Sequence, residues 1–208
     1  MLIQLDHVKK EYGDFTLELD MQIPENRVIG LIGANGAGKS TTFKLMLGLI
    51  RPDAGDVKVF EKKEGELSAE DRQKIGTVFS DSGFSEYLTV QQVGRIMQEF
   101  YSDFEPEQFY RRCEYFHIPQ KKKIKEFSTG MKAKLKILLA VSHDSRLLIL
   151  DEPTAGLDVI AREEILDILR GYMEVPGRSV VLSSHISGDL EHFCDDLYMI
   201  DKGKIVLH

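Results

Sequence analysis

A glycine-rich segment near the start of the chain has the residue types that bind phosphate. It reads Gly33-Ala-Asn-Gly-Ala-Gly-Lys39-Ser40. Glycines let backbone N–H groups approach phosphate oxygens with no Cβ in the way, the lysine supplies a cation for the β- and γ-phosphates, and the serine hydroxyl can ligate Mg²⁺. The residues expected to contact the nucleotide or its metal here are Asn35, Gly36, Gly38, Lys39, Ser40 and Thr41.

The residues on both sides of this loop favour the same interpretation. Residues 27–32 form a short, largely apolar run typical of a buried strand, and residues 43–47 have the pattern of a helix. A phosphate loop needs this order of strand, glycine-rich turn and helix, and the helix adds the positive end of its dipole. The alternative is a glycine-rich turn with an incidental lysine, which the two flanking elements disfavour.

A pair of carboxylates follows a second apolar run. Residues 147–150 are all aliphatic and end at Asp151 and Glu152, before Pro153. In phosphate-loop enzymes an aspartate at the tip of a core strand holds the Mg²⁺ shell. A glutamate one residue further can accept the proton of the water that attacks the γ-phosphate. The pair therefore predicts an ATPase with Glu152 as catalytic base; a surface Asp-Glu pair is the alternative.

The order of apolar patterns predicts an α/β fold. Strands are expected at 2–8, 15–23, 55–60, 75–79, 146–150, 179–183 and 197–200, and helices within 89–142 and at 161–173. The first two strands read as an antiparallel region joined at Gly13-Asp14. Strands that alternate with helices later in the chain predict a mainly parallel sheet. We expect residues 1–83 and 144–208 to form an ATP-binding core lobe and residues 84–143 to form a helical subdomain.

Composition narrows the class of protein. The chain has 208 residues and a net charge of −7, which argues against a nucleic-acid partner. No run approaches the roughly 18 apolar residues of a spanning helix, and the N-terminus lacks the basic head of a signal peptide. Cys113 and Cys194 have no metal spacing and are expected to be reduced, which indicates a cytosolic protein. The lysines at 121–125 read as a solvated face, or else as a contact for an acidic partner or membrane.

Five segments in fixed order resemble the nucleotide-binding subunit of an ATP-binding cassette (ABC) transporter. They are Gly33–Ser40, Phe127-Ser-Thr-Gly-Met131, residues 147–152, Ala155-Gly-Leu-Asp158 and the lone His185. The resemblance covers essentially the whole chain and implies a phosphate-loop NTPase core with ATP and Mg²⁺ as cofactors. It also implies head-to-tail pairing with a second copy or a homologous ATPase subunit, and an integral membrane partner. The chain would then lie at the cytoplasmic face of the membrane as a peripheral subunit.

The resemblance implies further site residues. Ser128, Thr129, Gly130 and Met131 form the signature that contacts the other subunit's ATP. Asp158 would lie on the dimer contact, and His185 would touch the γ-phosphate, although a lone histidine after a strand is usually structural. Tyr12 matches the aromatic residue that stacks on adenine in this family; a turn tyrosine is the alternative.

The chain departs from the family pattern at two places. The usual signature is Leu-Ser-Gly-Gly-Gln, and here Thr129 and Met131 replace a glycine and the glutamine. A glutamine usually follows the strand at 75–79, whereas this chain has Ser80 and Asp81, either of which is expected to contact the metal instead. Many relatives also continue beyond the position of His208. The signature variant and the missing extension resemble compact bacterial ATPases that export peptides, antibiotics or other amphiphiles.

Two other functions remain open at this point. One is a degenerate module that binds ATP to stabilise a dimer and hydrolyses little, which the changes at Ser80, Thr129 and Met131 favour. The other is a soluble ABC-type ATPase without a transporter, which the single cassette and the acidic charge disfavour. For a transporter subunit, we expect the membrane partner to dock near residues 82–101, where Phe84, Tyr87 and Leu88 lie; the alternative is that these side chains pack the insertion's own core.

Overall fold

The computed structural model describes residues 1–79, 83–185, 190 and 192–208, and within these ranges ten strands form one sheet. The strands are β1 (Ile3–Tyr12), β2 (Phe15–Ile23), β3 (Val28–Ile32), β4 (Ala54–Val59), β5 (Lys62–Lys63), β6 (Ile75–Val78), β7 (Leu147–Leu150), β8 (Ser179–Ser184), β9 (Asp196–Asp201) and β10 (Lys204–Leu207). The α-helices are α1 (Lys39–Met46), α2 (Ala69–Gln73), α3 (Val90–Phe100), α4 (Pro106–Tyr115), α5 (Thr129–Ala140) and α6 (Val159–Met173). Their spatial order across the sheet is β5-β4-β1-β2-β10-β9-β3-β8-β7-β6.

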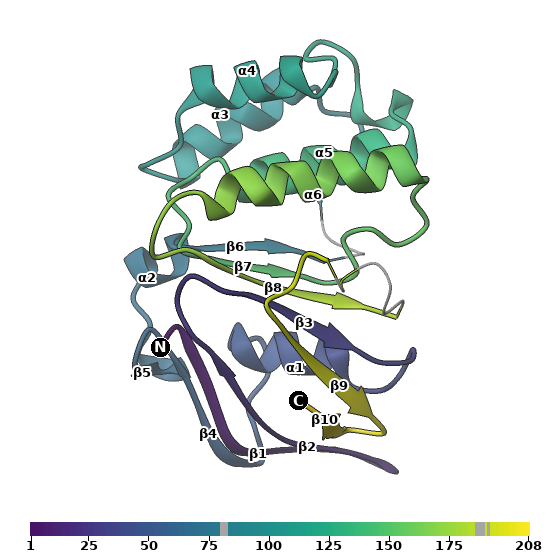
Figure 1. Ribbon diagram of the computed structural model, residues 1–208. Coiled ribbons are helices and arrows are strands. Elements are labelled where there is room, and N and C mark those ends of the chain that lie inside the picture. Colours follow the sequence, from purple (N-terminus) through teal and green to yellow (C-terminus); the bar gives the residue numbers. More distant parts are fainter. Residues whose placement is uncertain (80–82, 186–189, 191) are drawn as a thin grey trace.

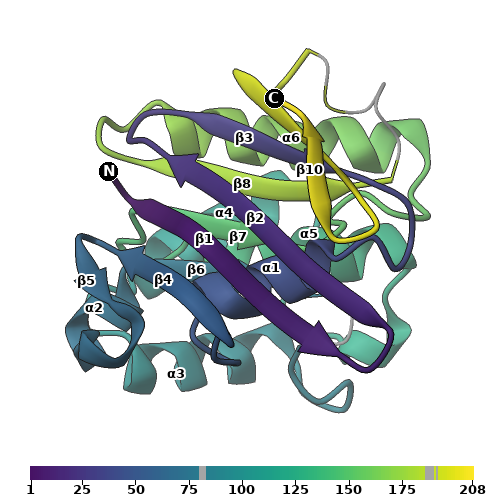
Figure 2. The same ribbon diagram turned by 90° about the horizontal axis from the view of Figure 1, so that it is seen from below.

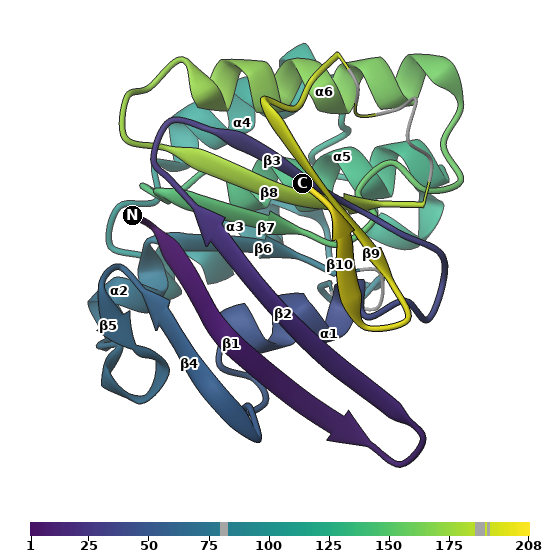
Figure 3. The ribbon, with the colours of Figure 1, turned by 60° about the horizontal axis from the view of Figure 1, so that its bottom comes forward.

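One half of the sheet is parallel. β9, β3, β8, β7 and β6 lie side by side with parallel pairing (Figure 3). The register sets Leu150 of β7 between Val78 of β6 and Leu182 of β8. Because the carboxyl ends of parallel strands meet at one edge, the loops after β3, β7 and β8 come together there. This edge holds most of the chemistry-bearing residues found in the sequence.

The other half is mainly antiparallel and wraps around α1 (Figure 2). β1 pairs antiparallel with β2 and with β4, β9 pairs antiparallel with β10, and a short parallel pairing joins β10 to β2 (Figure 3). The β1–β2 turn contains Gly13 at φ +52°, in the left-handed region that glycine adopts without strain. Phe43 and Met46 of α1 are fully buried in a core between this half and the parallel strands. The predicted fold class, with its parallel sheet and N-terminal antiparallel region, is confirmed.

Helices cover the opposite face of the parallel strands. α3, α4 and α5 follow β6 and precede β7 in the chain, and they form a layer with α6 (Figure 1). Side chains of successive strand residues point to opposite faces, so Leu147 and Ile149 of β7 belong to the α1 core. Leu148 and Leu150 belong to the core under the helices. β7 is therefore buried on both faces, as its unbroken apolar run indicates.

Local signals set several helix ends. The Thr89 hydroxyl accepts a hydrogen bond from the Gln92 backbone N–H at 3.3 Å, and the Gln92 side chain accepts one from Thr89 N–H at 2.9 Å. This capping box starts α3 at Val90. Pro106 opens α4, where its missing N–H costs no helical bond.

The boundaries of other elements differ from the sequence expectation. α1 begins at Lys39 rather than at residue 43, because the glycine loop leads directly into the helix. β1 extends to Tyr12, paired with Phe15 across the hairpin. The short elements β5, β10 and α2 were not expected, since runs this short show little periodicity. Within the described residues, none of the helices is long and apolar enough to cross a membrane.

The two cysteines and the lysines at 121–125 match the sequence expectation. Both cysteines are free thiols, and burial raises the pKa of Cys113 and of Cys194 to about 12. The lysines at 121, 122, 123 and 125 are all exposed. They form a solvated face, and an acidic partner for it remains untested.

Candidate functional site

The glycine-rich loop lies between β3 and α1 in a conformation that requires glycine. Gly38 has φ +118° and Gly36 has φ +80°, both in the left-handed region. A Cβ at Gly38 would lie 2.7 Å from Leu17 Cδ1, and one at Gly33 would lie 2.4 Å from the Ile200 carbonyl oxygen. A Cβ at Gly36 would meet nothing within 4 Å. The loop is therefore packed tightly on its inner side and open on its outer side, where a phosphate can approach the first N–H groups of α1.

Lys39 lies inside this loop. Its ammonium group donates to the Gly33 carbonyl at 2.7 Å and to the Ala34 carbonyl at 3.2 Å. The same Nζ lies 3.1 Å from Glu152 Oε1, and the two side chains are 6% and 18% exposed. A poorly hydrated cation thus joins the loop to the end of β7. Among the other predicted loop residues, Asn35 is exposed and Thr41 is half-buried.

Ser40 and Asp151 come together across 111 residues of sequence. The Ser40 hydroxyl donates to Asp151 Oδ2 at 2.6 Å. The Asp151 side chain is nearly buried at the end of β7, and its other oxygen accepts a hydrogen bond from Ser183 Oγ at 2.6 Å. A hydroxyl and a carboxylate are hard oxygen donors of the kind that Mg²⁺ prefers. This pair is therefore chemically suited to the metal expected from the sequence.

Glu152 adopts an uncommon backbone conformation. Its φ is +52°, a left-handed value that costs a non-glycine residue energy and that clusters at functional sites. Its N–H donates to Ser183 Oγ at 2.8 Å. Its carboxylate contacts Lys39 through one oxygen and His185 Nδ1, at 2.5 Å, through the other. The structure thus brings His185, at the end of β8, together with the predicted base.

Ser183 was missed by the sequence reasoning. It occupies the next-to-last position of β8, is fully buried and contacts both carboxylate residues. The available signal was a hydroxyl residue two positions before His185, at the end of an apolar strand. A buried hydroxyl in such a run needs a hydrogen-bond partner, and the adjacent strand end supplies it.

The described hydrogen bonds do not join the predicted signature to this cluster, although Thr129 lines the same pocket as Asp151 and Glu152. The Ser128 hydroxyl accepts from Met131 N–H at 3.2 Å and caps α5. Ser128 and Thr129 are exposed, and Gly130 lies close to α6, where an added Cβ would be 2.9 Å from Ala161 Cβ. Asp158 caps α6 by accepting from Ala161 N–H at 2.8 Å. The exposed signature and Asp158 therefore lie on neighbouring helix starts.

The predictions for Tyr12, Ser80 and Asp81 are not tested by the described contacts. Tyr12 ends β1 and is 47% exposed, with Lys10 Nζ 5.6 Å from its ring centroid. Its ring is thus accessible, and its stacking on adenine stays a prediction. Ser80 and Asp81, the expected substitutes for the metal-binding glutamine, lie outside the described residues. Their role stays a prediction.

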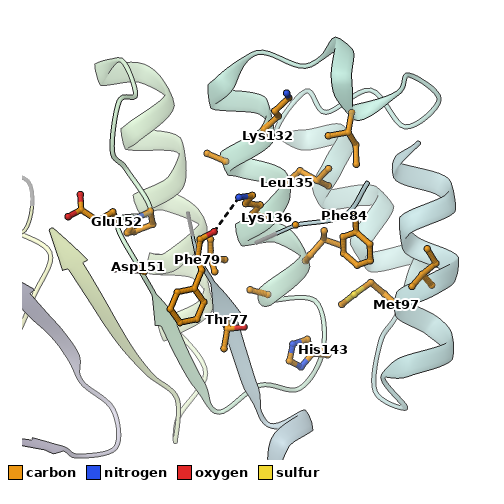
Figure 4. Close-up of a pocket in the computed structure, with 18 of the residues that line it drawn as sticks. Thr77, Phe79, Phe84, Met97, Lys132, Leu135, Lys136, His143, Asp151 and Glu152 are labelled. Carbon is orange, nitrogen blue, oxygen red and sulfur yellow. Dashed lines mark hydrogen bonds between the residues drawn. The ribbon is translucent and has the colours of Figure 1, made fainter. Parts of the chain in front are cut away.

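A groove of about 1020 Å³ runs from the carboxylates to the helical layer. Figure 4 shows Asp151 and Glu152 at one side of it and Phe84 and Met97 at the other. His143 also lines the groove; it is 4% exposed and stacks on Tyr101 with ring centroids 4.2 Å apart. Among the residues that the structure describes, none is a hydrogen-bond partner of its Nδ1. Burial lowers the pKa of His143 to about 4. The groove is therefore lined by apolar and charged side chains, including Lys132 and Lys136, and by a neutral imidazole.

Comparisons with known proteins identify the family and the fold of this chain. A family model described as "ABC transporter" matches residues 17–155, which is more than half of the chain. The lantibiotic transport ATP-binding protein SrtF of Streptococcus pyogenes is 34% identical over 212 residues, covering 99% of this chain and 90% of that protein. The bacitracin transport ATP-binding protein BcrA of Enterococcus faecalis is 31% identical, covering 99% and 68%.

A solved structure has the same fold. The ATP-binding subunit of an ABC transporter superposes with a TM-score of 0.87 at 26% identity, covering all of this chain and 89% of that one. The phosphate loop, the carboxylate pair and the family match lead to one conclusion. The chain belongs to the ABC transporter family and is an ATP-hydrolysing, nucleotide-binding subunit of that family.

Proposed function

We propose that this ATPase powers an exporter of peptides, antibiotics or similar amphiphiles. We assign ATP hydrolysis to four residues because they meet at one edge of the sheet. They are Lys39, Ser40, Asp151 and Glu152. Support for export comes from the relatives, whose names refer to transport of lantibiotics and bacitracin and to linearmycin resistance. We further propose that residues 1–83 and 144–208 form the ATP-binding lobe and residues 84–143 the helical subdomain.

Hydrolysis follows from the roles of three side chains. Lys39 binds the β- and γ-phosphates and offsets their charge. Glu152 accepts a proton from water as the water oxygen attacks the γ-phosphorus; the bond from that phosphorus to the β–γ bridging oxygen breaks, and ADP leaves with the electron pair. His185 contacts Glu152 Oε2 and so orients the carboxylate toward the water. When bound, Mg²⁺ supplies charge neutralisation to the phosphates, and Ser40 and Asp151 are the residues that would hold it.

The signature is proposed to act on the ATP of a second subunit. Ser128 and Thr129 are exposed at the N-terminus of α5, where the helix dipole favours an anion. Neither contacts the phosphate loop of its own chain through a described hydrogen bond. A second copy, or a homologous ATPase subunit, would place these residues against its partner's γ-phosphate. Asp158, beside them at the start of α6, would link the two sites, and the exposed Val159 and Ile160 add apolar surface to this contact.

The groove is the proposed docking site of an integral membrane subunit. Phe84 lines it and packs against the core, whereas Leu88 mainly packs the core. Tyr87 is 70% exposed and follows Glu86, which lines the groove. His143 lies buried under the wall of this groove, so it adds no accessible polar contact. The expected occupant is a short amphipathic helix of the membrane subunit. This docking would hold the chain at the cytoplasmic face of the membrane.

A degenerate ATP-binding module is the second candidate function. Thr129 and Met131 favour it, because they change the signature that closes the partner's site. The contacts of Glu152 argue against a degenerate module. A glutamate that served only nucleotide binding would need neither the contact with His185 nor a left-handed backbone.

Two measurements test the proposal. Phosphate release from Mg²⁺-ATP by the purified chain separates an ATPase from a binding module, and Glu152→Gln is the control for contaminating activity. Affinity purification of the tagged chain from detergent-solubilised membranes of its own host tests for the transporter. Recovery with an integral membrane protein, lost in a groove variant, is the expected outcome; recovery only in the soluble fraction would indicate a non-transport ATPase.

A further inference from the structure

Ser183 lies where the two strands that carry the site end side by side. β7 and β8 are parallel, with Leu150 opposite Leu182, so Asp151 and Ser183 are the next residues of each strand. Ser183 is fully buried. A hydroxyl buried at this point has no access to water, so its hydrogen-bond partners must come from the residues that follow the neighbouring strand β7.

Both hydrogen bonds of this hydroxyl go to residues of the proposed site. Ser183 Oγ donates its one proton to Asp151 Oδ1 at 2.6 Å. The same oxygen accepts the backbone N–H of Glu152 at 2.8 Å. One side chain therefore fixes the carboxylate of one residue and the backbone of the next, and the second of these is the residue with φ +52°.

The two contacts have separate consequences. Because Ser183 holds Oδ1 of Asp151, the other oxygen, Oδ2, faces Ser40. Because Ser183 accepts the Glu152 N–H, it stabilises the left-handed backbone from which the Glu152 side chain reaches Lys39 and His185. Without the hydroxyl, the Glu152 N–H would lose this acceptor and the Asp151 carboxylate could rotate.

We propose that Ser183 is a positioning residue that couples the metal-binding carboxylate to the catalytic base. Because it is fully buried, it acts through Asp151 and Glu152. The inference rests on the proposed roles of those two residues. It predicts that loss of one hydroxyl weakens metal-assisted nucleotide binding and turnover together, while leaving metal-independent nucleotide binding intact.

β8 supplies a matched control at its other end. Ser179 is also a fully buried serine of β8; its hydroxyl donates to the Pro24 carbonyl at 2.9 Å and accepts from Arg27 N–H at 3.3 Å. Ser179→Ala therefore removes the same group, one donated and one accepted bond, and the same burial, away from the site; its acceptor is a neutral carbonyl in place of a carboxylate. Ser183→Thr retains the hydroxyl and is the rescue variant. Ser183→Cys, with a weak donor in place of the hydroxyl, is the second variant if Ser183→Ala fails to fold.

The experiment compares nucleotide binding with and without metal. Affinity for AMP-PNP is measured by titration in Mg²⁺ and in EDTA, and kcat and KM are measured with Mg²⁺-ATP. For Ser183→Ala we expect the Mg²⁺ enhancement of binding and kcat each to fall about 10- to 100-fold, the range for loss of a residue that orients a metal ligand. Binding in EDTA should stay unchanged, Ser183→Thr should restore both quantities, and Ser179→Ala should resemble the unmodified chain.

Three results would overturn the inference. They are Ser183→Ala behaving as Ser179→Ala does, Ser183→Ala losing binding equally in Mg²⁺ and EDTA, and a folded Ser183→Thr with no recovery. Failure of the proposed function looks different, because the unmodified chain would then show no Mg²⁺-dependent binding or turnover. Thermal unfolding of each variant separates a stability loss from a positioning effect, since Ser179→Ala gives the cost of removing a buried β8 serine.

Discussion

Lys39 Nζ and Glu152 Oε1 lie 3.1 Å apart, so the side chain proposed to bind the phosphates contacts the side chain proposed to accept the proton. Both groups are poorly exposed, which makes their attraction stronger than that of a surface pair. Phosphate oxygens must compete with Glu152 for Lys39. Nucleotide binding would thereby free one oxygen of the base, which links occupancy of the site to its catalytic readiness.

Replacement of Lys39 should weaken nucleotide binding strongly. In Lys39→Ala the charge-assisted contact to the phosphates disappears, and we expect ATP affinity to fall about 10- to 100-fold. Titration with ATP in Mg²⁺ measures the effect. Lys44→Ala, at an exposed lysine of the same helix, is the control and should bind as the unmodified chain does. Equal affinities in the two variants would disprove the phosphate-loop assignment.

Replacement of Glu152 should abolish turnover but not binding. Glu152→Gln keeps the shape of the side chain and cannot accept the proton, so kcat should fall by roughly 10² to 10⁴. ATP should then persist and hold a dimer that size-exclusion chromatography detects. Glu174→Gln, at an exposed glutamate after α6, is the control. Normal turnover in Glu152→Gln would rule out the role of base.

The ion pair of Lys134 with Glu164 should stabilise the contact between α5 and α6. Lys134 is 8% exposed, lies 2.8 Å from Glu164 and also donates to the Phe116 carbonyl. Lys134→Met should lower the free energy of unfolding by about 1–3 kcal/mol, because a hydrogen-bonded charge is lost and its partners stay behind. Lys132→Met breaks the more exposed pair with Glu86 and should cost less than about 1 kcal/mol. Urea unfolding measures the free energy of unfolding of both variants. Equal losses of this free energy in the two variants would contradict the prediction.

Charges in the groove should block assembly with the membrane subunit. Phe84→Asp places a carboxylate on the groove wall, and Tyr87→Asp places one at an exposed residue next in sequence to Glu86, which lines the groove. Both variants should bind ATP normally and lose co-purification with the membrane subunit. Tyr115→Asp changes an aromatic residue of α4 that is 76% exposed, against 70% for Tyr87, and lies far in sequence from the groove residues near Phe84, and it should assemble. Intact assembly of folded Phe84→Asp and Tyr87→Asp would argue against docking here.

His143 should make the protein less stable in mild acid. Its folded pKa of about 4 lies below the ordinary value of 6.5, chiefly because burial disfavours the charged form. Between these values the unfolded state binds more protons, so stability is full above pH 6.5 and declines as the pH falls toward 4, by about 3 kcal/mol. In His143→Phe, which can still stack on Tyr101, the pH dependence of urea unfolding should flatten. His192→Gln, at an exposed histidine, should leave it unchanged.

Local sequence patterns were sufficient for the fold and for much of the candidate site. The period-two alternation of residues 15–23 marked β2, and the unbroken apolar run before Asp151 marked a strand buried on both faces. Thr89 and Pro106 stand at helix starts, where capping and a missing N–H act on the nearest few residues. The glycine spacing before Lys39 indicated the phosphate loop for the same reason, since a tight turn depends on its own residues.

The relationships between segments were decided by the tertiary structure. Ser40 meets Asp151 across 111 residues, and Ser183 meets Asp151 across 32, only because β3, β8 and β7 lie side by side in one register. The burial of His143 depends in the same way on how the helical layer covers the sheet. Short-range preferences act along the chain and can be read from it, whereas register and packing are set by contacts among all the strands and helices together.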